Sequence, residues 1–97
     1  MIVRIFRVTV HPDLHQEFED KVLSTSVPLV QAHAGVVSVS VGRPTQWSPE
    51  EYVMVSTWEG KDALLEFAGE HWDQAVIPEG METYVKQCWV HHYEVFG

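Results

Sequence analysis

The chain has 97 residues, of which 45% are apolar, and this is enough for one domain with a single small core. Six Lys and Arg against fourteen Asp and Glu give a formal net charge of −8, so the surface as a whole should repel nucleic acid and anionic membranes. The one cysteine, Cys88, excludes an internal disulfide, and no apolar run reaches transmembrane length. We therefore expect a single domain over residues 1–97 that is cytosolic and binds neither nucleic acid nor membrane.

The chain begins with the pattern of a strand followed by that of a helix. Ile2–Val10 alternates with apolar side chains on both faces, which predicts a strand. Apolar residues four positions apart then predict an amphipathic helix: Leu14, Phe18 and Val22. We expect Ser24–Pro28 to interrupt this helix, because proline does not fit the helix interior. A second helical piece over 29–34 should end at Gly35.

The rest of the chain predicts three more strands and one more helix. In chain order these are a strand over Val36–Gly42, a strand over Tyr52–Trp58 after an exposed connection, a helix that ends near Gly69, and a last strand from Tyr84 or Val85 to Phe96. One helical turn is expected between Glu79 and Val85. In the second strand, Val37, Val39 and Val41 should share one face.

The order β-α-β-β-α-β favours an α+β, ferredoxin-like fold, with a four-stranded antiparallel sheet and both helices on one face. Two helices cover only one face of such a sheet, yet the strands carry apolar or aromatic residues on both. Left uncovered, such a face would expose a larger apolar patch than soluble monomers usually carry. We therefore predict a symmetric homodimer that packs sheet against sheet.

The stretch YVMVSTWEGKDALLEFAGEHW, followed by a final strand containing VHHYEV, resembles the antibiotic biosynthesis monooxygenase family of dimeric ferredoxin-like α+β barrels. That family has a strand ending in Glu-x-Trp, a helix starting Lys-x-Ala-Leu, a His or aromatic on the helix, and His-aromatic after it. The residues that match are Trp58, Lys61, Ala63, Leu64, Phe67, His71 and Trp72. Haem-degrading members need an Asn and a His where this chain has Arg7 and Val76, so the resemblance does not extend to haem degradation.

The resemblance implies a cofactor-independent monooxygenase that acts on an aromatic, polyketide or quinol-like small molecule. The substrate itself gives electrons to oxygen once it has lost a proton, so the protein supplies a base, an oxyanion partner and a dry pocket. Ser56 and Phe67 stand where members often carry Glu and His, so we expect the base to be His71, or else His91. The remaining site residues are expected to be Arg7 or Tyr93 as donors to a phenolate, and Trp58, Phe67 and Trp72 as walls for a small apolar aromatic ligand.

Each assignment has a structural alternative. A helix dipole favours His71 near a helix C-terminus whether or not it is catalytic, and Trp58 and Trp72 are more often core residues. His91 and His92 are neighbours on a strand and point to opposite faces, so they do not chelate one metal, and no metal site is predicted. The rival functions are a non-catalytic dimeric ligand-binding or stress-response module and an isomerase or decarboxylase. A titratable group sharing the cavity with aromatic walls would favour an enzyme.

Overall fold

Four strands form one antiparallel sheet in the computed structural model, which describes residues 1–69, 72–73 and 80–97. The strands are β1 (Ile2–Val10), β2 (Val36–Gly42), β3 (Glu51–Trp58) and β4 (Val85–Glu94). Their order across the sheet is β2-β3-β1-β4, which is that of a ferredoxin-like fold. The α+β class predicted from the element order is therefore confirmed.

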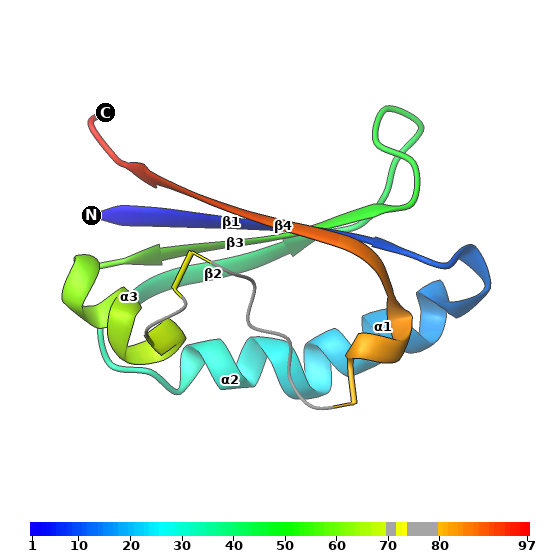
Figure 1. The fold of residues 1–97 in the computed structure, drawn as a ribbon, viewed down its shortest axis with the longest axis horizontal. Helices are drawn as coiled ribbons and strands as arrows, with labels where there is room; N and C mark the ends of the chain where they lie inside the picture. Colours follow the sequence, from blue (N-terminus) through cyan, green and yellow to red (C-terminus); the bar gives the residue numbers. More distant parts are fainter. Residues whose placement is uncertain (70–71, 74–79) are drawn as a thin grey trace.

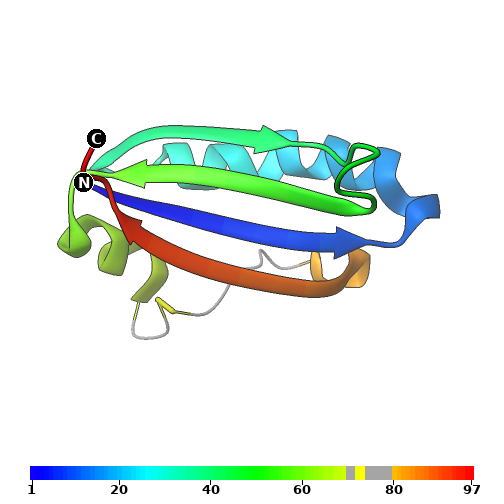
Figure 2. The same ribbon diagram turned by 90° about the horizontal axis from the view of Figure 1, so that it is seen from above.

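The helices that the structure describes lie on one face of the sheet, and none of them covers the other, open face (Figure 1). They are α1 (His15–Lys21), α2 (Val27–Gln31) and α3 (Lys61–Ala68), with short 3-10 turns η1 (Pro12–Leu14) and η4 (Glu82–Tyr84). Seen from above, the helical stretch over residues 12–31 lies on the β2 side of the sheet and α3 on the β4 side (Figure 2). None of the helices in the described ranges is long and apolar enough to cross a membrane.

The expected interruption at Ser24–Pro28 was wrong. The chain stays helical there and widens into one π-helical segment, η2 (Val22–Ser26), before α2 begins at Val27. Pro28 lacks an N–H and its ring would clash with the carbonyl four residues earlier. A wider turn removes that clash without ending the helix, since Pro28 then falls in the first turn of α2.

Smaller features also differ from the expectation, among them the end of α2 at Gln31 instead of residue 34. β4 ends at Glu94, although the backbone N–H of Val95 still donates to the carbonyl of Met1 at 3.0 Å. In β2 the register shifts between Val36 and Ser38, and this irregularity leaves Val37 52% exposed instead of aligned with Val39 and Val41. The single helical turn expected before β4 is η4, and the Glu79 end of that prediction lies outside the described residues.

The strand register decides which side chains face the helices. Arg4 lies opposite Ser56 on β3 and His92 on β4, and this set of positions faces the helical layer. Arg7 lies opposite Val53 and Trp89, and this set faces the open side. Alternation along a strand thus sends the two arginines of β1 to opposite faces.

The core consists of two separate clusters beneath the sheet. One cluster joins β1, β3 and α1 to η4, with buried side chains Val8, Val10, Phe18, Tyr52, Met81 and Tyr84. The other lies at the α3 end, with buried side chains Val30, Trp58 and Leu64. Gly35, at φ +88°, allows the chain to pass α3 closely before β2.

Candidate functional site

A cavity of about 150 Å³ lies between the sheet and the helices. β1 and β3 form one side, and α1, η2, α2 and α3 contribute to the other. Most of its lining is apolar, including Phe6, Val8, Phe18, Val22, Met54 and Phe67. Its polar side chains are few: Arg4, Glu19, Ser26, Arg43, Tyr52 and Ser56. Such a cavity suits a small, mainly apolar ligand that is held by a few polar contacts.

Arg4 provides a buried cation at the α3 end of this cavity. The residue is 4% exposed, and its Nη1 donates to the carbonyl oxygen of Trp72 at 2.8 Å. Nη1 also lies 2.8 Å from Nε2 of His92, and the guanidinium carbon is 5.7 Å from the ring centroid of Phe67. These contacts come from β4, α3 and the segment after α3, so the guanidinium is fixed from three sides.

The contact between Arg4 and His92 defines the protonation of the imidazole. A guanidinium has no acceptor, so Nε2 of His92 accepts and the ring is neutral, with its proton on Nδ1. Burial and the neighbouring charge of Arg4 both lower the pKa of His92, consistent with a neutral ring. Burial lowers the pKa of Arg4 to about 10, so the guanidinium still carries its charge at neutral pH.

Ser56 lies beside Arg4 on the cavity wall and is held by Trp58. Nε1 of Trp58 donates to Oγ of Ser56 at 3.0 Å, which leaves the serine O–H as a donor. Trp58 is fully buried and stacks on Phe67 with ring centroids 5.1 Å apart. His33 packs edge-on against Phe67 with ring centroids 5.0 Å apart. The aromatic wall at this end is therefore fixed by its neighbours.

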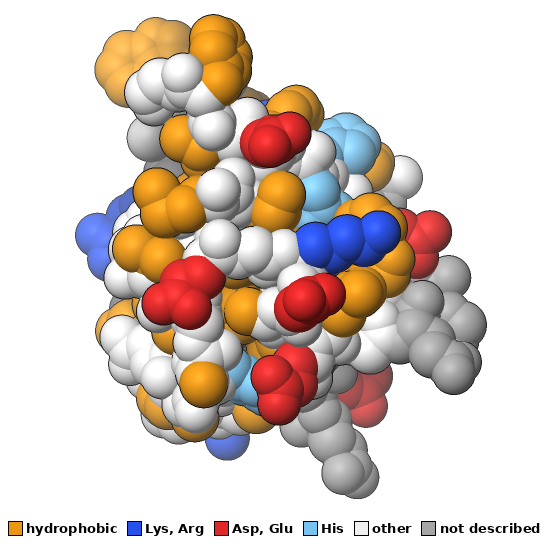
Figure 3. Space-filling view, turned by 90° about the vertical axis from the view of Figure 1, so that its left-hand side faces the viewer, with side chains coloured by type: hydrophobic (Ala, Val, Ile, Leu, Met, Phe, Trp, Pro, Cys, Tyr) orange, Lys and Arg blue, Asp and Glu red, His pale blue; other side chains and the backbone are white. Residues whose placement is uncertain are grey.

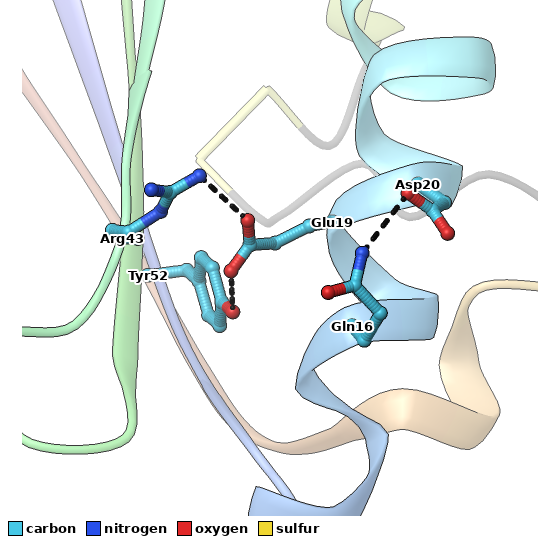
Figure 4. Close-up of polar contacts among 5 residues, drawn as sticks. All are labelled: Gln16, Glu19, Asp20, Arg43 and Tyr52. Atoms are coloured by element: carbon cyan, nitrogen blue, oxygen red, sulfur yellow. Dashed lines mark hydrogen bonds and ion pairs between the residues drawn. The ribbon is translucent and has the colours of Figure 1, made fainter.

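A second polar group lies at the α1 end of the cavity (Figure 4). The hydroxyl of Tyr52 donates to Oε2 of Glu19 at 2.7 Å, and Nη2 of Arg43 donates to Oε1 at 2.9 Å. The hydrogen bond from Tyr52 is the largest cause lowering the pKa of the Glu19 carboxyl. Burial and the carboxylate raise the pKa of Tyr52, so the pair is a carboxylate with a neutral phenol.

The structure brings some of the predicted site residues to the cavity and separates others from it. Phe67 lines the cavity, Trp58 lies behind it in the core, and Trp72 packs edge-on against His92 at 4.9 Å. Two further predicted residues, His91 and Tyr93, are exposed on the open face of the sheet.

The two remaining predicted residues are also not among the cavity residues described. Arg7 faces the open side, where its Nε lies 3.6 Å from a carboxylate oxygen of Glu51. His71 lies outside the described residues.

Arg4, Glu19 and Tyr52 were not among the site residues predicted from the sequence. Arg4 has the same strand parity as Phe6 and Val8, but both faces of β1 carry apolar residues, so parity alone did not show which arginine faces the helices. Glu19 carried no signal either, because it looks like any charged residue of an amphipathic helix. Its partner Tyr52 is 33 positions away in the sequence, and only the fold brings the two together.

The fold and the cavity define a small ferredoxin-like α+β protein with a mainly apolar internal cavity. A family model for the antibiotic biosynthesis monooxygenases matches residues 1–76, which is most of the chain. The chain therefore belongs to the antibiotic biosynthesis monooxygenase family. A comparison with curated proteins finds no match.

Several solved structures have the same fold. A mutant of SnoaB, a cofactor-independent oxygenase from Streptomyces nogalater, is 18% identical with a TM-score of 0.74, over 97% of this chain and 91% of that chain. A Bordetella bronchiseptica protein named for the same family is 22% identical with a TM-score of 0.74, over 98% and 96%. A mutant of MhuD with two manganese protoporphyrin IX bound per active site is 21% identical with a TM-score of 0.73, over 98% and 94%. At these identities the likeness supports the shared fold.

Proposed function

We propose that this protein is a cofactor-independent monooxygenase that acts on a hydroxyaromatic or quinol-like small molecule. The observation that carries the proposal is the buried guanidinium of Arg4, which lines a mainly apolar cavity beside the aromatic ring of Phe67. A cavity built only to hold an apolar ligand has no need of a buried cation, whose desolvation is costly. Family membership points to the same chemistry.

In the proposed reaction a phenol or hydroquinone first loses a proton and becomes a phenolate. The phenolate gives electrons to O2, a carbon–oxygen bond forms, and loss of water from the resulting hydroperoxide leaves a new carbonyl. The substrate supplies the electrons, so the protein's part is to stabilise the phenolate and exclude water. Arg4 is the proposed oxyanion partner in place of Arg7, because its charge lies at the cavity and that of Arg7 lies on the open face.

His71 remains the proposed base, since Nε2 of His92 already accepts from Arg4. We assign His92 a positioning role, in which it holds the guanidinium of Arg4 against the cavity wall. His91 and Tyr93 are proposed to contact the second subunit, because they lie on the open face, which none of the described helices covers.

The proposed enzyme is a homodimer through the open face of the sheet (Figure 1). This face carries the exposed side chains of Trp89 (41%) and Tyr93 (51%), and Val95 and Phe96 extend the apolar surface beyond β4. Apolar side chains also project at the top of Figure 3, on the side of the open face. A second copy would remove this surface from water, which favours association. The cytosolic location stays a prediction.

Oxygen uptake by purified, metal-stripped protein tests the proposal. The substrates are a panel of naphtho- and anthra-hydroquinones, and the variants are Arg4→Met and His71→Ala. We expect uptake above autoxidation, lowered about 100-fold or more by either substitution. Asp20→Asn is the matched control, since Asp20 is exposed and its carboxylate accepts only from Gln16 among the bonds described. Uptake no faster than autoxidation across the panel would contradict the proposal and favour a ligand-binding module.

A further inference from the structure

The two ends of the cavity present opposite hydrogen-bonding character. Among the described residues, the polar side chains that line the α3 end are Arg4, which is only a donor, and Ser56, whose oxygen already accepts from Trp58. At the α1 end the hydroxyl of Tyr52 donates its hydrogen bond to Glu19 and remains a neutral phenol, so Oη and the carboxylate oxygens still have lone pairs to accept with. The described α3 end therefore presents donors, whereas the α1 end presents acceptor oxygens together with the guanidinium of Arg43, which donates to the Glu19 carboxylate.

The carboxylate has room for a further donor. Its two oxygens offer about four acceptor sites, and Tyr52 and Arg43 occupy one on each oxygen. The side chain of Glu19 is 28% exposed and lines the cavity, so it is reachable by a ligand. Arg43 holds the carboxylate from the outer side, with a side chain that is 76% exposed.

The spacing of the two ends sets the length of a ligand that reaches both. Ser56 and Tyr52 lie four residues apart on β3 with side chains on the same face, roughly 13 Å along the strand. A ligand that lies along β3 and reaches both groups therefore needs its two oxygens at opposite ends of the molecule. One or two fused aromatic rings with oxygens at opposite ends meet this requirement. The cavity volume of about 150 Å³ also points to one or two rings, because sites for drug-sized ligands are several times larger.

We propose that this cavity binds a one- or two-ring hydroxyaromatic in a single orientation, with an acceptor oxygen at Arg4 and Ser56 and a hydroxyl donating to Glu19. This inference rests on the proposed function and specifies its substrate class. It assigns Glu19 as the residue that determines specificity for a free hydroxyl at the far end of the substrate. The orientation would place the oxygen that becomes a phenolate beside the cation, at a distance from the carboxylate that would oppose its charge.

Three related probes test the orientation by isothermal titration calorimetry: 2,6-dihydroxynaphthalene, its monomethyl ether and its dimethyl ether. The diol and the monomethyl ether each have one hydroxyl for Glu19 and one oxygen to accept from Arg4, so their Kd values should agree within about threefold. The dimethyl ether has no donor and should bind about tenfold or more weakly, since a hydrogen bond to a charged group is lost. Equal Kd values for all three probes, or no binding of any, would overturn the inference.

Variants locate the acceptor. The quantity to compare is the gap in affinity, which is the Kd of the dimethyl ether divided by the Kd of the monomethyl ether. Glu19→Gln should reduce this gap at least threefold, because the acceptor loses its charge. Asp20→Asn makes the same chemical change on the adjacent residue of α1, outside the cavity lining, and should leave the gap unchanged (Figure 4). Tyr52→Phe keeps the carboxylate and should also preserve the gap. A gap lost with Tyr52→Phe and kept with Glu19→Gln would overturn the assignment to Glu19.

These titrations need no turnover, so they separate this inference from the proposed activity. Selective binding without oxygen uptake would uphold the oriented site and contradict the monooxygenase. Oxygen uptake with no preference for the free hydroxyl would uphold the monooxygenase and overturn the oriented site.

Discussion

Tyr52→Phe removes a single oxygen atom from the α1 end of the cavity. Tyr52 is 6% exposed, and its ring packs against Phe18 with centroids 4.8 Å apart and edge-on against His15 at 5.2 Å. A phenylalanine ring keeps both contacts. The substitution therefore isolates the 2.7 Å hydrogen bond from the hydroxyl to Glu19.

The geometry sets the expected loss of stability. A hydrogen bond to a charged group contributes about 1.5 to 3 kcal/mol. The carboxylate of Glu19 keeps its hydrogen bond from Arg43, and its side chain is 28% exposed. Water can therefore replace part of the stabilisation that the Tyr52 hydroxyl provided. We expect the free energy of unfolding to fall by about 1 to 1.5 kcal/mol, or roughly 5 to 10 °C in Tm for a chain of this size.

The same bond predicts a pH dependence. It is the largest cause that lowers the pKa of Glu19 in the folded protein, so its stabilisation is present above the pKa of an unfolded Glu carboxyl. That stabilisation is lost as the pH falls through the lower, folded pKa. The difference between the parent protein and Tyr52→Phe should therefore shrink in acid.

Urea unfolding at fixed protomer concentration measures the effect, because association would make the apparent stability depend on concentration. A double-mutant cycle with Glu19→Gln should give a coupling of about 1 kcal/mol. Zero coupling, or a Tyr52→Phe variant as stable as the parent protein at neutral pH, would refute the reasoning.

Three further predictions test other parts of the structure. In urea unfolding, Gly35→Ala should lower the free energy of unfolding by at least about 1 kcal/mol more than Gly69→Ala does. Both glycines have positive φ, but only a Cβ added at Gly35 would lie 2.5 Å from Cβ of Ala63. Equal losses of stability in the two variants would contradict this. Trp89→Glu should convert the proposed dimer to monomer in sedimentation velocity at micromolar concentration, because a charge would be buried in the apolar interface; a dimer of unchanged affinity would count against the open face as the interface. The free energy of unfolding should decrease as the pH falls below about 6.5, because the pKa of His92 is lowered in the folded protein and the unfolded chain binds a proton that the folded chain does not. His92→Asn should flatten this dependence of the unfolding free energy on pH. An unchanged dependence in the variant would refute this role of His92.

The sequence was sufficient for the fold because the local patterns agree with the tertiary structure. Two-residue alternation predicted β1 and β2 with the observed ends, and the end of α3 follows from Gly69, which has φ +74°. The helical region was harder, because Pro28 indicates a break when only its local preference is considered. The observed π-helical segment keeps the helix packed on the sheet, and that packing is a tertiary effect.

The site was predicted less well, for a reason that lies in the strands. Alternation separates Arg4 from Arg7 but does not say which of them faces the helices when both faces are apolar. The choice depends on how α3 and the helical stretch over 12–31 pack, and no local pattern contains that information. The pairing of Glu19 with Tyr52 likewise exists only after folding.

Incorporation of oxygen isotope would show directly whether the protein transfers oxygen from O2 to its substrate. Purified, metal-stripped protein would be supplied with ¹⁸O2 and a naphthohydroquinone substrate, and the product analysed by mass spectrometry. We predict one ¹⁸O atom per product molecule, with the other atom released as water. In Arg4→Met this labelling should fall to the autoxidation background. Product without ¹⁸O, or labelling equal in the parent protein and the Arg4 variant, would contradict a monooxygenase that works through the buried arginine.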